Sequence, residues 1–403
     1  MDIYVARQPI FNQEKKIFGY ELLFRDSMKN VFSGIDGNTA TSKVLSNSFL
    51  NIGIDRLIGR GVAFINFTKE LLVNQLPKLF PNNQMVIEVL EDVDPDSAVI
   101  NACKELSSLG YTIALDDFFY RKGMEPLIAA SDIIKFDFRA MPPEKMASLA
   151  EKLKKYNKKL LAEKVETNEE FDFALKMGFK YFQGYFFSKP EIIGGKDITP
   201  AQINMLEIMS EVNRPNFTFS KVEQIITRDV SISYKLLRYI NSAYYRRMNE
   251  ISSIKQAITL LGERGIRSFL SLIAMTNLSQ DKPDELIRSS IIRAKFCELM
   301  ANCIVTRPDS SELFTLGLFS SIDAILDDTM ENIMGKLPLS EAIKVALING
   351  EGKLKPYLEM AKCYERGDWE GYTKITNDVR IVDEKLPDFF LEALTWADVI
   401  TTA

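Results

Sequence analysis

The sequence predicts an α/β barrel of the (β/α)8 type in residues 1–195, followed by an all-helical domain in residues 200–403. Up to about residue 190, short apolar runs of strand length alternate with amphipathic helical segments, which is typical of a parallel sheet covered by helices. Polar residues recur near the ends of these runs, where barrel active sites are built. After the segment GGKDITP at 194–200, no run has the pattern of a strong strand.

Eight strands are predicted in the first half, enough to close a barrel. The run YVARQPIF at 4–11 pairs as a hairpin with the next run across NQEKK, so the first strand is antiparallel. The other seven strands are predicted at 17–24, 61–67, 84–90, 111–117, 132–138, 159–165 and 181–187. A helix between two of them, within 94–110, has Asp94 or Asp96 as its N-cap and ends at Gly110.

The second half has apolar residues at helical spacing throughout. Helical segments are predicted at 219–229, 233–245, 253–262, 265–279, 286–304 and 339–350.

The composition excludes several classes of function. A net charge of -5 provides no basic field for nucleic acid. The sequence has neither the n- and h-regions of a signal peptide nor an apolar run of ~20 residues, so we expect a cytoplasmic protein without a membrane partner.

The chain contains no histidine. Histidine is the commonest general base and a favoured ligand of transition metals. Any catalysis must therefore depend on carboxylates, on lysine and on oxygen-bound ions such as Mg²⁺ or Mn²⁺.

Nearly every predicted strand carries a polar residue, several of them in its C-terminal half. These residues are Glu21, Asn66, Glu88, Asp116 with Asp117, Lys135, Glu163 and Gln183. Taken singly, each is explained by a salt bridge or a turn. Together at one barrel mouth, the carboxylates would repel one another unless cations neutralised them, so the set predicts a site for up to two Mg²⁺ or Mn²⁺ ions. Because successive strand residues face opposite sides, we expect Asp116 to point into the barrel and Asp117 into the loop.

The first half resembles the EAL domain of cyclic di-GMP phosphodiesterases, over residues 1–193. The resemblance is carried by GYELLFR, INFT, IEVLE, LDDF, IIKFD, AEKVE and FQGYFFSKP, which occur in the family's order. It implies a barrel of the EAL type, shorter than most relatives. It also implies that two ions are held by Glu21, Asn66, Glu88, Asp116 and Asp117. Lys135 then orients the attacking water, and Glu163 takes its proton.

Three further residues receive roles from the same resemblance. Arg25 corresponds to the phosphate-contacting arginine, Gln183 to the glutamine of the closing motif, and Glu91 to the glutamate that steadies the loop after the aspartate pair. That loop departs from the family, because Phe119, Tyr120 and Arg121 stand where relatives have a small loop containing glycine. AEKVE departs as well, since Lys164 replaces a glycine.

The second half resembles the HDOD domain, a helical relative of the HD phosphohydrolases. The matching segments are INSAYY, SIKQAITLLG and ELFTLGLFSSIDAIL. Ser320 and Ser321 stand where the parent hydrolases have the HD dyad, so this half is expected to be an interaction or regulatory module rather than an enzyme. Its expected partner is a protein, and a homodimer is left open.

Three functions remain open. The altered loop favours a receptor or adaptor of cyclic di-GMP whose EAL half is a weak or inactive phosphodiesterase, and we take this as the first hypothesis. The complete set of carboxylates favours the alternative, an active metal-dependent phosphodiesterase that produces 5′-pGpG. The third is a structural scaffold in which one cation stabilises the acidic residues.

Overall fold

The computed structural model describes residues 4–25, 53–59, 61–189, 205, 208–213, 218–242, 244–245, 251–278, 282–303, 308–379, 381 and 385–402. The chain forms two compact units. The first comprises Met1–Phe187 with Glu365–Trp369, and the second comprises Ser188–Tyr364 with Glu370–Ala403. The predicted boundary segment at 194–200 lies outside the described residues.

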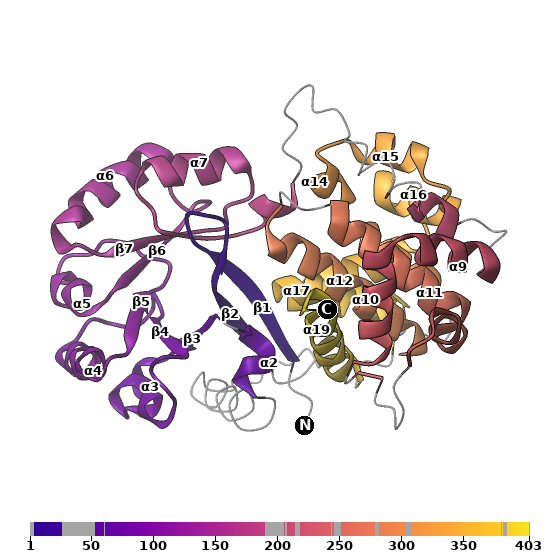
Figure 1. Ribbon diagram of the computed structural model, residues 1–403. Helices are drawn as coiled ribbons and strands as arrows, with labels where there is room; N and C mark the ends of the chain where they lie inside the picture. The colour runs from indigo at the N-terminus through magenta and orange to yellow at the C-terminus, as the bar shows by residue number, and fades with distance from the viewer. Residues whose placement is uncertain are drawn as a thin grey trace. The chain divides into compact units, whose positions relative to one another are not determined.

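The first unit contains a closed barrel of eight strands in sequence order (Figure 1). The strands are β1 (Tyr4–Phe11), β2 (Ile17–Arg25), β3 (Val62–Phe67), β4 (Met85–Val89), β5 (Thr112–Leu115), β6 (Ile133–Asp137), β7 (Lys159–Glu163) and β8 (Tyr181–Gln183). β1 is antiparallel to both neighbours, β2 and β8, and every other neighbouring pair is parallel. The predicted barrel and its antiparallel first strand are confirmed.

The interior of the barrel contains a layer of apolar side chains. It consists of Ile10, Phe64, Val86, Ala114, Ile133, Leu161 and Tyr181. Because alternate strand residues face the same side, the next inward position in each parallel strand lies two residues further on. Those positions are Asn66, Glu88, Asp116, Lys135, Glu163 and Gln183. The period of the strands therefore places a polar layer directly above the apolar one, at the carboxyl ends of the strands.

Short helices cover the outside of the barrel (Figure 1). They are α2 (Ile54–Ile58), α3 (Lys69–Val73), α4 (Ser97–Ser108), α5 (Glu125–Ala130), α6 (Pro143–Leu153) and α7 (Asn168–Lys176), with 3-10 turns at η2 (Leu76–Leu79), η3 (Lys154–Tyr156) and η4 (Phe186–Ser188). Asp96 is the N-cap of α4, since its side chain accepts from the N–H groups of Ala98 and Val99, both at 3.0 Å. Gly110 follows the helix with a φ of 87°.

The strands β3 to β8 are all shorter than predicted, and the early ends of β5 and β8 affect the positions of predicted site residues. β5 ends at Leu115, so the aspartate pair follows the strand instead of ending it. The N–H of Asp116 still bonds to the carbonyl of Val89 on β4 at 2.9 Å, but Asp117 has a φ of 37°, which breaks the extended backbone. β8 ends at Gln183, where Gly184, with a φ of 143°, turns the chain away.

The second unit is helical in its described residues, as predicted for the second half. Its helices are α9 (Phe219–Arg228), α10 (Val230–Ile240), α11 (Ile254–Leu278), α12 (Asp284–Met300), α13 (Ser310–Phe319), α14 (Ile322–Leu326), α15 (Met330–Lys336), α16 (Glu341–Ile348), α17 (Lys355–Arg366), α18 (Trp369–Val379) and α19 (Leu386–Thr402), with a 3-10 turn at η5 (Ala301–Cys303). Gly262, with a φ of 67°, divides α11 into two helices. Within the described ranges, none of the helices is long and apolar enough to span a membrane.

Candidate functional site

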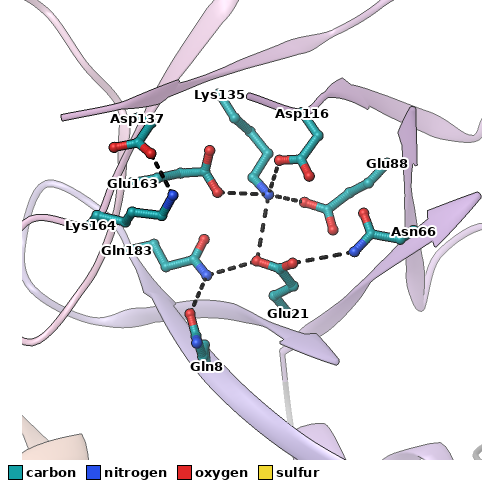
Figure 2. Close-up of polar contacts among 10 residues, drawn as sticks. All are labelled: Gln8, Glu21, Asn66, Glu88, Asp116, Lys135, Asp137, Glu163, Lys164 and Gln183. Carbon is teal, nitrogen blue, oxygen red and sulfur yellow. Dashed lines mark hydrogen bonds and ion pairs between the residues drawn. The ribbon is translucent and has the colours of Figure 1, made fainter. Parts of the chain in front are cut away.

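Lys135 lies at the centre of the polar layer and is fully buried. Its Nζ is 2.5 Å from Glu88 Oε1, 2.6 Å from Asp116 Oδ1, 2.9 Å from Glu163 Oε1 and 3.5 Å from Glu21 Oε2 (Figure 2). We call these five residues the lysine–carboxylate cluster. Its four acids come from β2, β4, β7 and the end of β5, so barrel closure brings together residues that are far apart in sequence.

Amide side chains border the cluster on the side of Glu21. Gln183 Nε2 donates to Glu21 Oε2 at 2.7 Å and to Gln8 Oε1 at 2.9 Å, and Asn66 Nδ2 donates to Glu21 Oε1 at 3.4 Å (Figure 2). Gln8 was not among the predicted site residues. The hairpin could have revealed it, because the register of β1 and β2 places Gln8 opposite Glu21.

Burial and mutual repulsion determine the protonation of the cluster. Burial, together with the charge of Glu21, holds the pKa of Glu88 well above its usual range. Burial also raises the pKa of Glu163 to about 8, in spite of the ammonium of Lys135. Although burial opposes its charge, Lys135 has a pKa well above the usual value because four carboxylates surround it. With these pKa values, the cluster holds a charged lysine and at least one neutral acid at pH 7.

The cluster offers donors that fit a hard divalent cation. In the described part of the chain, Glu88 Oε2, Glu163 Oε2 and Gln183 Oε1 are buried and accept no hydrogen bond. Buried polar atoms without partners are rare, and carboxylate and amide oxygens are the ligands preferred by Mg²⁺ and Mn²⁺. In the part of the chain that the structure describes, no three acids are arranged to coordinate one metal ion. The acids of the cluster face Lys135 instead.

A second pair of charges lies beside the cluster, at the ends of β6 and β7. Lys164 Nζ forms an ion pair with Asp137 Oδ2 (Figure 2). Asp137 Oδ1 accepts from the N–H groups of Arg139 and Ala140 at 2.6 and 3.1 Å. Asp117 is half-buried and contacts none of the cluster residues in a hydrogen bond; burial and the charge of Asp116 raise its pKa. As expected, Asp116 points into the barrel, whereas Asp117 belongs to the loop.

The loop after Asp117 is fastened to the outside of the barrel mouth. Arg121 Nη2 donates to the carbonyl of Glu91 at 2.6 Å, and the hydroxyl of Tyr120 donates to Glu125 Oε1 at 2.6 Å. The side chains of Phe119 and Tyr120 remain 45% and 49% exposed. A cavity of about 280 Å³ lies beneath this loop and is lined by both aspartates, Phe119 and Arg121. Glu91 thus supports the loop through its main chain, and its predicted side-chain role stays a prediction.

The remaining positions singled out in the sequence are Arg25 and two serines of the helical unit. Arg25 ends β2, but its side chain lies outside the described part of the structure. In the helical unit, Ser320 is the C-cap of α13 and Ser321 is the N-cap of α14. Arg293 Nη1 donates to their hydroxyls at 2.5 and 3.1 Å. Arg293 is buried. An arginine side chain therefore bonds to both serines that the resemblance assigns to the HD positions.

The raised pKa of Glu163 predicts a pH-dependent stability in the presence of EDTA. Between the ordinary value of 4.5 and the folded value of about 8, the folded protein holds a proton that the unfolded chain has released. Stability therefore falls with rising pH, by about 1.4 kcal/mol per pH unit for this group. The Glu163→Gln variant lacks this dependence, so its stability relative to the parent should increase from pH 5 to pH 8 in urea unfolding. Glu166→Gln, at a side chain that is 54% exposed, is the control; a difference for Glu163→Gln that is constant with pH would contradict the prediction.

Comparison with known proteins gives matches to both units. Residues 37–190 match the EAL domain family, and residues 199–337 match the HDOD domain family. A Vibrio cholerae protein named cyclic di-GMP phosphodiesterase CdgJ is 38% identical over 400 residues, covering 98% of this chain and 93% of that protein. The uncharacterized protein YuxH of Bacillus subtilis is 38% identical over 404 residues, covering 98% of both chains. The solved structure of a standalone EAL protein from Vibrio cholerae with c-di-GMP bound is 25% identical, with a TM-score of 0.37 over 47% of this chain and 92% of that chain.

Proposed function

The chain belongs to the family of proteins in which an EAL domain is followed by an HDOD domain, and from this we propose that its barrel binds cyclic di-GMP and hydrolyses it slowly. The lysine–carboxylate cluster is the observation that carries the proposal. A buried set of acids with unsatisfied oxygens is costly to maintain unless it binds something. The full-length relative named a cyclic di-GMP phosphodiesterase supports the choice of substrate.

The cation of the proposed site is Mg²⁺ or Mn²⁺. Glu21, Asn66, Glu88 and Asp116 would hold it, because the three acids already meet at Lys135 and Asn66 donates to Glu21. When bound, such an ion stabilises the negative charge that develops on a phosphodiester oxygen. It would also compete with Lys135 for the same carboxylates, and would thereby free the ammonium of Lys135 to hold a water molecule.

Lys135 and Glu163 then prepare the water for attack on phosphorus. Their side chains are 2.9 Å apart, so one water can contact both. Lys135 donates a hydrogen bond to the water oxygen, and Glu163 accepts a proton from the water. Positive charge near Glu163 lowers its pKa toward neutrality, the range in which a general base is most effective. We assign Arg25 and Gln183 to binding of the substrate.

The loop at 119–121 supports slow rather than fast turnover. In place of a small loop, it carries two aromatic residues and an arginine that is tied to the carbonyl of Glu91. A loop fixed by such contacts has little freedom to adjust around the phosphate. The same observation supports a second candidate function, a receptor that binds cyclic di-GMP without cleaving it.

The HDOD half is proposed to bind a protein partner. Its HD positions are serines bonded to the buried Arg293, and the whole chain lacks histidine, so the chemistry of the HD hydrolases has no ligands here. A homodimer through this half remains part of the proposal.

Purified protein with Mn²⁺ should bind cyclic di-GMP and release 5′-pGpG at less than ~1 per second, the lower end of ordinary enzyme turnover. Binding is measured by calorimetry and the product by chromatography. Glu21→Ala should abolish turnover, with Glu14→Ala on the exposed hairpin loop as its control. Faster turnover would make the protein an ordinary phosphodiesterase, and binding without any product would favour the receptor. A protein that binds no cyclic di-GMP would refute the proposal.

A further inference from the structure

Lys164 occupies a backbone position that does not favour lysine. It follows directly after Glu163, the last residue of β7, and has a φ of 55°. This left-handed region is readily adopted by glycine and disfavoured for residues with a Cβ. The lysine is therefore held there against its own preference, and the contacts of its side chain give the reason.

The Lys164 side chain is 55% exposed, and its ammonium lies next to carboxylates. It forms an ion pair with Asp137, whose side chain is only 9% exposed (Figure 2). Although partial burial opposes its charge, this ion pair and the charges of Asp117 and Glu163 raise the pKa of Lys164. Asp137 ends β6 opposite Glu163 on β7, so the two strand ends place an acid on each side of Lys164. Both oxygens of Asp137 are engaged, one by Lys164 and the other by two backbone N–H groups.

The acids at the mouth thus divide into two sets, each with its own lysine. Glu21, Glu88, Asp116 and Glu163 contact Lys135. Asp137 lies beyond this cluster and pairs with Lys164, and the charge of Lys164 also acts on the pKa of Asp117, lowering it against the effects of burial and of Asp116. A second divalent ion shared by the adjacent aspartates would have to lie beside Asp117, where the charge of Lys164 already compensates the acids and would repel it.

We propose that the ammonium of Lys164 takes the place of a second cation, so that the barrel binds one divalent ion instead of two. The inference rests on the cation dependence in the proposed function and adds the number of ions to it. It gives the slow turnover a second cause besides the loop. With one ion, the charges on the attacking and leaving oxygens are not both stabilised by metal.

The test is the number of Mn²⁺ ions bound, measured by calorimetry and by electron paramagnetic resonance of free Mn²⁺. The parent should bind one ion. Lys164→Gly removes the ammonium and suits the backbone, and should bind two; Lys164→Asn is the second variant, since asparagine tolerates the left-handed region. Lys164→Arg keeps the charge and should bind one. Lys154→Gly, which removes a lysine that is 66% exposed on η3, is the control and should also bind one.

The second ion should depend on Asp117, so that Lys164→Gly combined with Asp117→Asn returns to one. Two ions in the parent, or one ion in both neutral variants, would overturn the inference while leaving the proposed function intact. No Mn²⁺ bound to parent or variants would overturn both. If the parent bound one Mn²⁺ ion but no cyclic di-GMP, the proposed function would be refuted and the inference about the ion number would stand.

Discussion

Replacing Lys135 with methionine is expected to destabilise the protein in EDTA by about 3–5 kcal/mol, the range found when one partner of a buried ion pair is removed. Methionine fills a similar volume but leaves Glu21, Glu88, Asp116 and Glu163 without a positive charge. The remaining acids can then avoid repulsion only by taking up protons or by separating. Added Mn²⁺ should restore much of the loss, because a divalent ion supplies the missing charge at the same place. Urea unfolding with and without Mn²⁺ measures both effects.

Lys69→Met is the matched control for this change. Lys69 also pairs with an acid, Asp96, but the two side chains are 50% and 40% exposed. Removing an exposed pair should cost no more than ~1 kcal/mol, and Mn²⁺ should not alter the loss. If Lys135→Met were as mild as this control in EDTA, the lysine would not be compensating the acids of the cluster.

Gly184→Ala should have an effect of similar size, through the backbone instead of charge. Gly184 has a φ of 143°, and a Cβ at this position would lie 2.0 Å from the carbonyl oxygen and 2.5 Å from the nitrogen of Val165. Val165 cannot move away cheaply, since its N–H bonds to the carbonyl of Gln183 at 3.0 Å. We expect a loss of more than about 3 kcal/mol in unfolding free energy. Cyclic di-GMP binding should weaken as well, because Gln183 and Glu163 lie at the displaced strand ends.

Gly178→Ala is the control that separates the steric clash of a new Cβ from the backbone strain of a positive φ. Gly178 also has a positive φ, 90°, but no atom lies within 4 Å of its ideal Cβ. Its replacement should cost only the left-handed conformation, about 1–2 kcal/mol. Equal losses for the two glycines would mean that the segment around Val165 relaxes freely, contrary to the packing at the end of β7.

The barrel and most of its inward-facing residues could be predicted from the sequence because both depend on local pattern. A period of two residues determines which strand positions face inward, and an unpaired polar residue at such a position needs a function or a partner. This reasoning identified Asn66, Glu88 and Glu163, and the structure brings them to one mouth. The site roles assigned to them remain predictions.

Other features depend on three-dimensional contacts that the pattern does not encode. The sequence marked Lys135 as one of several polar strand residues, but its four ion pairs depend on barrel closure. The ion pair of Lys164 depends on an unusual φ that residue type alone would argue against. The sequence shows that Phe119, Tyr120 and Arg121 replace a small loop, but the bond from Arg121 to a backbone carbonyl gives no signal in the sequence.

The antiparallel β1 has a consequence for how this protein is made. The ring is completed where Ile10 pairs with Gln183 and Phe11 with Phe182, at opposite ends of the barrel sequence. Such distant pairings form late, since the intervening chain must first be brought into place. During synthesis on the ribosome, the early hairpin and the growing row of parallel strands therefore each expose an unpaired edge until β8 emerges. Unpaired edges are sites of aggregation, so the time between the translation of residues 11 and 181 is the period in which the nascent chain most needs protection by chaperones.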